Sequence, residues 1–337
     1  MPILSLSKGG LPLVPHFVLF LTLFLGASFL SLAESSAVGE GIDQDSSQNI
    51  EQEAQQEIVI DSIQSLFSVL SSANKFYQYH SLLTYEANGY ITTFKLKHRV
   101  ENEVAYQQLM FMDGPDRQVF RRQGLSGCLN GATRWGLWPT AVPTSSLSAY
   151  DFRAVGFERV ANRQAIMFDI LPKDELRYGY RYSIDRETGL ILKVITYDNG
   201  KIIERLQAVS LELGKLDESL VDEESGYVWR VPEVEPCHTE QFQSGWTVDW
   251  LPEGFESVGN RVTAQGEQVL IFADGLVSVS VFIINDNSKP LNKATARHGA
   301  TVVVVAPVSS QANRSIAVVG EVPTITARRI AVSVKPQ

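Results

Sequence analysis

Apolar and polar residues along the chain follow a helical period first and a strand period afterwards. Apolar residues recur every three or four positions within residues 58–74, which predicts an amphipathic helix. From Phe76 the period changes to two, and the turn signals Asn88-Gly89 and Asp198-Asn199-Gly200 separate the apolar runs. Up to residue 214, the pattern therefore predicts a meander of mostly antiparallel strands, with the helix available to cover one face of the sheet.

The strand period returns in a shorter second part. Residues 215–244 are acidic and contain prolines, which is typical of a connection between domains. Strand-like apolar runs resume after Trp246, and residues 324–332 have a helical pattern. The helix residues expected to face inward are Ile325, Ala327, Ile330 and Ala331. This part therefore predicts a small α+β domain with one sheet and one helix.

The predicted fold class is α+β with mostly antiparallel β-structure. A large curved sheet, like half of a barrel, with a covering helix should form the first domain, and a smaller α+β unit the second. The expected divisions are a signal peptide over 1–33, a disordered leader over 34–57, the first domain over 58–214, a connection over 215–244 and the second domain over 245–337.

The first 33 residues differ in composition from the rest of the chain. Lys8 is their only charged residue, an apolar run covers residues 17–30, and the small residues Ser31 and Ala33 follow it, as signal peptidase requires. The run is shorter than the roughly 20 apolar residues that a membrane span needs. We therefore expect a cleaved secretory signal that ends near Ala33 and a soluble exported protein, with an uncleaved anchor as the alternative.

Charge argues against one class of partner. Removal of the single positive charge of Lys8 changes the net charge from −9 to −10. Phosphate contacts need clustered cations, so an acidic chain is a poor general binder of nucleic acids. Nucleic acid is not an expected partner.

The chain contains two cysteines, Cys128 and Cys237, both in polar segments that resemble turns. An even number of cysteines in an oxidising compartment favours a disulfide. We predict a Cys128–Cys237 bridge, which would close a loop of roughly a hundred residues and stabilise the fold by restricting the unfolded chain. Two separate thiols are the alternative.

Patterns for catalysis and metal binding are absent from the sequence. There is no G-x-S-x-G elbow, H-E-x-x-H helix, P-loop or C-x-x-C pair. The histidines are scattered, and Cys237 and His238 are adjacent in sequence, so they would not face one another on a strand. We predict that the protein is not an enzyme and has no catalytic residue, metal site or cofactor.

Aromatic and aliphatic residues gather on the predicted strands. Tyr178, Tyr180 and Tyr182 alternate along one strand and therefore share a face. In the simpler interpretation they fill the core of the sheet, and in the other a curved sheet encloses an apolar ligand. The candidate residues of the cavity wall are Leu109, Phe111, Phe120, Tyr178, Tyr180 and Tyr182.

Cationic residues flank the turn that Asp113, Gly114 and Pro115 predict. A solvated outer face is the simpler interpretation, and a charged rim or partner surface for an acidic segment or lipid phosphates is the other. The candidate residues of this rim are Arg99, Arg117, Arg121 and Arg122. Asp113 itself is expected to accept a hydrogen bond in the turn rather than to act as a catalytic acid.

Several segments, taken in order and spacing, resemble the MucB/RseB family of negative regulators of the envelope-stress sigma factor (sigma-E, or AlgU). The first contains Met112-Asp113-Gly114-Pro115 followed by Arg117 and Val119. The others are residues 150–165, the opening of the second domain at 246–255, the Asp274-Gly275-Leu276 step and the C-terminal segment. The resemblance covers roughly residues 60–334.

The resemblance implies a function without catalysis. The first domain would be similar to the lipoprotein carriers LolA and LolB, with an apolar cavity, and the second would bind the partner. The protein would be periplasmic, bind the periplasmic part of a membrane anti-sigma factor of the MucA or RseA type, and shield it from DegS-type proteolysis. Lipopolysaccharide or a lipoprotein acyl chain would release the partner. A periplasmic lipid or lipoprotein carrier is the alternative, and assembly into a homodimer or larger oligomer is left open.

Overall fold

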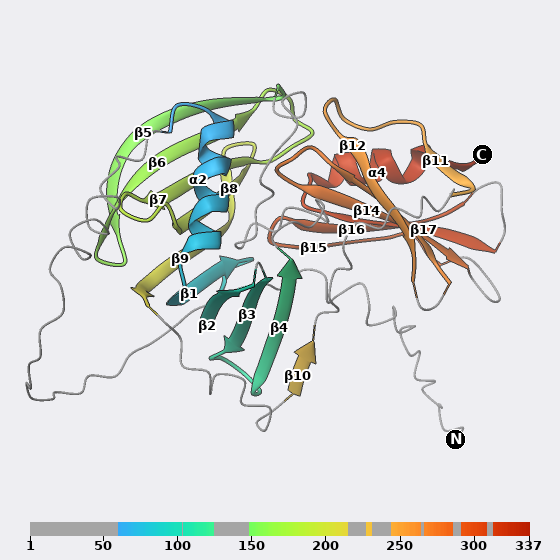
Figure 1. Cartoon of the computed structure of the whole chain (residues 1–337). Helices are drawn as coiled ribbons and strands as arrows, with labels where there is room; N and C mark the ends of the chain where they lie inside the picture. The colour runs from blue at the N-terminus through green and yellow to red at the C-terminus, as the bar shows by residue number, and fades with distance from the viewer. Residues whose placement is uncertain are drawn as a thin grey trace, which may run out of the picture.

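The computed structural model consists of two β-rich domains (Figure 1). The described residues are 60–102, 104–124, 148–214, 227–230, 244–263, 266–285, 291–308 and 313–337. The predicted signal peptide, the predicted leader and both cysteines lie outside them, so the expected Cys128–Cys237 bridge stays a prediction.

A ten-stranded sheet dominates the first domain and curves around one helix (Figure 1). Two meanders, β1 to β4 and β5 to β9, join where β1 pairs antiparallel with β9. In sheet order, the strands are β10 (Tyr227–Arg230), β4 (Arg117–Gly124), β3 (Val104–Phe111), β2 (Tyr90–Glu101), β1 (Tyr79–Ala87), β9 (Lys201–Leu213), β8 (Ile191–Asp198), β7 (Gly179–Asp185), β6 (Arg163–Pro172) and β5 (Tyr150–Val160). The predicted fold class is confirmed. Strand β10 lies within the predicted connection and pairs parallel with β4.

Three tight turns set the register of this sheet. In the β1–β2 turn, Asn88 and Gly89 have φ values of 52° and 79°, and Ala87 pairs with Tyr90. Positive φ at both central residues is the geometry that asparagine and glycine tolerate and that matches the twist of the strands. The turns at Ala161-Asn162 and Asn199-Gly200 also have positive φ at both residues. The two Asn-Gly turns were predicted correctly.

Helix α2 (Ile63–Phe76) covers the inner face of the curved sheet (Figure 1). It begins with a capping box, in which the Ser65 backbone N–H donates to Ser62 Oγ at 3.1 Å and the Ser62 backbone N–H donates to Ser65 Oγ at 2.9 Å. Its buried apolar stripe is Ile63, Leu66, Phe67 and Leu70. The periodicity identified this stripe, although the helix begins later than residue 58.

The last turn of α2 is attached to the sheet by a buried polar network around His98. The imidazole Nε2 donates to the Asn74 carbonyl oxygen at 2.7 Å, and Gln107 Nε2 donates to its Nδ1 at 3.3 Å. Tyr79 stacks on the ring at 4.8 Å between centroids and donates its hydroxyl to Asn74 Oδ1. Burial lowers the pKa of His98 to about 4, although its hydrogen bond to the Asn74 carbonyl opposes that effect.

Acidification is expected to destabilise the fold through His98. The folded state keeps this imidazole neutral, whereas the unfolded chain protonates it below its ordinary pKa of about 6.5. Stability is therefore lost as the pH falls from about 6.5 towards about 4, and at about pH 5 the loss amounts to about 2 kcal/mol. Urea unfolding of wild type and His98→Gln at about pH 7 and about pH 5 measures it. Parallel pH dependence in the two proteins would contradict this role.

In its described residues, the second domain is a six-stranded antiparallel sheet with one helix. In sheet order, its strands are β12 (Glu256–Val262), β13 (Gln268–Ala273), β14 (Ser278–Asn285), β17 (Arg314–Gly320), β16 (Thr301–Pro307) and β15 (Ala294–His298). Helix α4 (Thr324–Ser333) packs on β16 and β17, and β11 (Trp246–Val248) pairs with β18 (Val334–Pro336). The sequence predicted this α+β arrangement. The prediction that Ile325 faces inward was wrong, because 64% of its surface is exposed.

Candidate functional site

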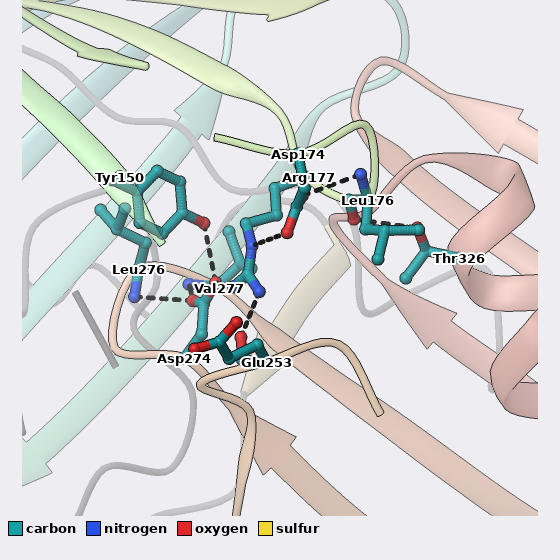
Figure 2. Close-up of polar contacts among 9 residues, drawn as sticks. All are labelled: Tyr150, Asp174, Leu176, Arg177, Glu253, Asp274, Leu276, Val277 and Thr326. Atoms are coloured by element: carbon teal, nitrogen blue, oxygen red, sulfur yellow. Dashed lines mark hydrogen bonds and ion pairs between the residues drawn. The ribbon is translucent and has the colours of Figure 1, made fainter. Parts of the chain in front are cut away.

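The two domains meet at the connection between β6 and β7, residues 173–178. Asp174 forms the turn, since its Oδ1 accepts the backbone N–H of Leu176 at 2.9 Å. Its Oδ2 accepts Nε of Arg177 at 3.1 Å, which leaves the rest of the guanidinium pointing at the second domain (Figure 2). The Arg177 side chain is completely buried. The turn therefore places a cation inside the domain interface.

Asp274, in the β13–β14 turn of the second domain, receives this cation. Its Oδ1 accepts the backbone N–H groups of Leu276 and Val277 at 3.1 and 3.0 Å, which fixes the carboxylate within its own turn. Its Oδ2 accepts a hydrogen bond from Arg177 Nη1 at 2.8 Å and another from the Tyr150 hydroxyl at 2.7 Å (Figure 2). Each oxygen of this buried carboxylate thus accepts two hydrogen bonds: Oδ1 from its own domain and Oδ2 from across the interface.

The electrostatics of this cluster depend on complete pairing. Burial raises the pKa of Asp274, and hydrogen bonds from Tyr150, Val277 and Leu276 together with the charge of Arg177 oppose the rise. Arg177 also donates through Nη2 to the carbonyl oxygen of Glu253. A buried ion pair adds little net stability, but loss of one partner leaves an uncompensated buried charge. The cluster therefore favours the docked arrangement of the two domains over any that separates the pair.

Two hydrogen bonds extend the contact towards helix α4. The Tyr178 hydroxyl donates to the Val322 carbonyl oxygen at 2.9 Å. The Thr326 hydroxyl donates to the Leu176 carbonyl oxygen at 2.8 Å (Figure 2). Because Thr326 lies in the first turn of α4, this helix is positioned directly on the β6–β7 connection.

The β15–β16 turn makes a second polar contact between the domains. The Glu204 carboxylate on β9 accepts the backbone N–H of Ala300 at 2.8 Å, the Tyr85 hydroxyl at 3.0 Å and the Thr196 hydroxyl at 3.1 Å. Gly299 has a φ of +56°, and a Cβ atom there would overlap both Glu204 Oε2 and the Tyr85 hydroxyl. The turn approaches the first domain as closely as it does because residue 299 has no side chain.

One buried apolar cluster runs through both domains. It contains Leu66 and Leu70 of α2, Tyr178, and Val279 and Ile330 of the second domain. Apolar burial is non-directional, whereas the Arg177–Asp274 and Glu204–Ala300 contacts are directional. The apolar cluster therefore favours contact between the domains, and the polar contacts select their relative orientation.

The predicted cavity-wall residues whose side chains are described fall into two separate buried clusters. Leu109 and Phe111 lie in a cluster with β1, β2 and β9, and the three tyrosines lie in the cluster that reaches the second domain. Tyr178, Tyr180 and Tyr182 are each no more than 1% exposed. Phe120 pairs in register with Gln108, and its side chain lies outside the described residues. An apolar ligand site along these residues stays a prediction.

The predicted rim residues do not form one strip among the described side chains. Arg117 places its guanidinium 3.5 Å from the centroid of the Phe111 ring, on the face where Phe111 contacts Phe94. Arg99 lies over Tyr106 and pairs with Glu101 at 3.5 Å, next in sequence to the buried His98. Since neighbouring strand residues point to opposite faces, Arg99 and Arg117 lie on different sides of the sheet. Burial lowers the pKa of Arg117.

The side chains of Arg121 and Arg122 lie outside the described residues. Asp113 accepts a hydrogen bond, as the sequence predicted, but its Oδ2 accepts from the backbone N–H of Thr93 on strand β2 rather than from within its own turn. Within the described ranges, no group of three or more His, Cys, Asp or Glu side chains could hold a metal ion. Among the helices within these ranges, none has the length and hydrophobicity of a transmembrane span.

Sequence reasoning missed the residues that join the domains. Tyr150 and the Asp274-Gly275-Leu276 step were noticed only as parts of a resemblance, without a role. No sequence pattern marks Arg177 or Glu204 as interface residues, since both stand among other charged or turn-forming residues. The available clue was Asp274-Gly275 between two apolar runs, which indicates a turn whose carboxylate caps it.

Comparisons with known proteins cover both domains. The MucB/RseB N-terminal domain family matches residues 62–232, and the MucB/RseB C-terminal domain family matches residues 240–335. The sigma factor AlgU regulatory protein MucB of Pseudomonas aeruginosa is 33% identical over 286 residues, which are 80% of this chain and 89% of MucB. The sigma-E factor regulatory protein RseB of Escherichia coli is 28% identical over 264 residues, 73% of this chain and 81% of RseB.

Solved structures agree with these matches. The structure of the Pseudomonas aeruginosa MucA/MucB complex is similar with a TM-score of 0.62 and 30% identity, over 81% of this chain and 98% of that chain. A crystal structure of MucB is similar with a TM-score of 0.58 and 29% identity, over 81% of this chain and 97% of that chain. The similarity therefore extends over nearly the whole of each matched chain.

Proposed function

The chain belongs to the MucB/RseB family, and from this premise we propose that it is a periplasmic regulator that binds the periplasmic region of a membrane anti-sigma factor of the MucA or RseA type. The observation that carries the proposal is the similarity to a chain solved as a MucA/MucB complex, at 30% identity and over 98% of that chain. Bound in this way, the anti-sigma factor is shielded from a DegS-type protease, and the sigma-E response is held off.

The proposed action is stoichiometric binding rather than catalysis. The relatives carry the names of regulatory proteins, and the sequence lacks the patterns of hydrolases and metalloenzymes. The Arg177–Asp274 and Glu204–Ala300 contacts support binding by both domains together, since a fixed orientation lowers the entropic cost of association.

Release of the partner is proposed to follow a shift in population. A ligand that binds the separated domains more tightly than the docked ones shifts the protein away from the binding form by its difference in affinity. Lipopolysaccharide or a lipoprotein acyl chain is the proposed ligand, on the strength of the resemblance. The buried Arg177–Asp274 pair is the interaction that such a ligand would have to break.

Direct binding tests this function. The purified mature chain is expected to bind the periplasmic region of its own genome's MucA-type anti-sigma factor in isothermal titration. A scrambled peptide of the same composition serves as the control and should not bind. A folded protein, verified by circular dichroism, that does not bind the authentic region would refute the proposal.

A further inference from the structure

Helix α4 has two faces with different surroundings. Its buried residues are Thr326, Ala327, Ile330 and Ala331. On the opposite side, Ile325, Arg328, Arg329 and Val332 follow one another at spacings of three, one and three residues and share one stripe. Ile325 is 64% exposed and Val332 is 78% exposed. The helix therefore presents two protruding aliphatic side chains beside two arginines.

The charge of this stripe, together with an aromatic ring that contacts it, points to a ligand surface. Arg329 lies 3.8 Å from the centroid of the half-buried Trp250 ring, and Arg328 donates to the Thr295 hydroxyl at 3.3 Å. Within the described residues, neither arginine pairs with a carboxylate. The chain as a whole is acidic, with a net charge of −9, so a locally cationic and apolar face departs from the rest of the protein.

We propose that this face of α4, defined by Ile325, Arg328, Arg329 and Val332, docks on the surface of an anionic lipid bilayer. Arginine and aliphatic residues on one face of a helix are typical of helices that lie in a membrane interface, and here the half-buried Trp250 contacts that face through Arg329. The guanidinium groups match lipid phosphates, and the aliphatic side chains can enter the headgroup region. Charge complementarity also orients the protein, because the acidic remainder is repelled by the same surface.

A bilayer fits this face better than a partner helix does. A docked helix needs a groove lined by apolar residues, whereas Ile325 and Val332 protrude from the surface. A flat anionic surface can contact both aliphatic side chains and both arginines at once. This contact lies on the opposite side of α4 from the residues that pack on β16 and β17.

Vesicle sedimentation tests the proposal. The mature protein should sediment at low salt with phosphatidylcholine vesicles that contain phosphatidylglycerol and not with phosphatidylcholine alone. Arg328→Gln with Arg329→Gln should weaken binding roughly thirty-fold, since each cation near an anionic surface raises the affinity roughly five- to six-fold. Ile325→Ser with Val332→Ser should also weaken it.

Matched variants keep the proposal falsifiable. Arg159→Gln with Arg186→Gln removes two exposed arginines of the first domain and changes the net charge equally, so it should bind like wild type. Equal binding by wild type and the Arg328/Arg329 variant, or no binding to anionic vesicles, overturns the proposal. Loss of a dimer on Ile325→Ser with Val332→Ser, without vesicle binding, would assign the face to a second copy and also overturns it.

Discussion

Replacing Asp274 by alanine is expected to lower the free energy of unfolding by about 3–5 kcal/mol. The change leaves Arg177 buried without its carboxylate partner and removes the acceptor of the Tyr150 hydroxyl. It also frees the backbone N–H groups of Leu276 and Val277. Guanidinium unfolding measures the loss of unfolding free energy. The slope of this free energy against denaturant concentration must be compared as well, because separated domains would change the slope.

Asp249→Ala provides the matched control for this prediction. Asp249 also lies in the second domain and pairs with Lys335, but the two side chains are 45% and 59% exposed. Exposed pairs contribute about 0–1 kcal/mol. Combining Asp274→Leu with Arg177→Met should recover part of the stability, because no charge is then buried alone. If Asp274→Ala costs no more than Asp249→Ala, the buried pair does not hold the domains.

Gly299→Ala is expected to destabilise the protein by about 2–4 kcal/mol through overpacking and an unfavourable positive φ. The new Cβ would overlap the Glu204 carboxylate and the Tyr85 hydroxyl, so the β15–β16 turn must withdraw. The hydrogen bond from the Ala300 backbone N–H to Glu204 would then be lost. Thermal unfolding should show the loss, and X-ray scattering should show a larger radius of gyration.

Gly89→Ala separates the steric effect from the backbone effect. Gly89 also has a positive φ, +79°, but a Cβ atom there has nothing within 4 Å. Its replacement should therefore cost only about 1 kcal/mol, the conformational part of the effect. Equal costs for Gly299→Ala and Gly89→Ala would contradict a close interdomain approach at the β15–β16 turn.

The sequence was sufficient for the elements whose signals are local. The stripe of α2 follows from a period of 3.6, and the Asn88-Gly89 turn follows from the positive φ that these residues tolerate. The error at Ile325 arose because aliphatic residues were assumed to face the core. At 100° per residue, Ile325 lies beside Arg328, Arg329 and Val332 instead.

The domain interface could not be predicted from local patterns. Arg177 and Asp274 are separated by 97 residues, and no periodicity relates one domain's turns to those of the other. The tyrosines illustrate the same limit. Their shared face was predicted, but alternation alone does not say whether Tyr178 faces a ligand or the Val322 carbonyl of the second domain, to which it donates.

Protease protection tests the central claim most directly. The periplasmic region of the cognate anti-sigma factor is incubated with a DegS-type protease, with and without the mature chain. The account predicts that cleavage slows in proportion to the bound fraction and stops at saturation. Cleavage at the same rate with saturating folded protein as without it would contradict the claim that this chain shields an anti-sigma factor.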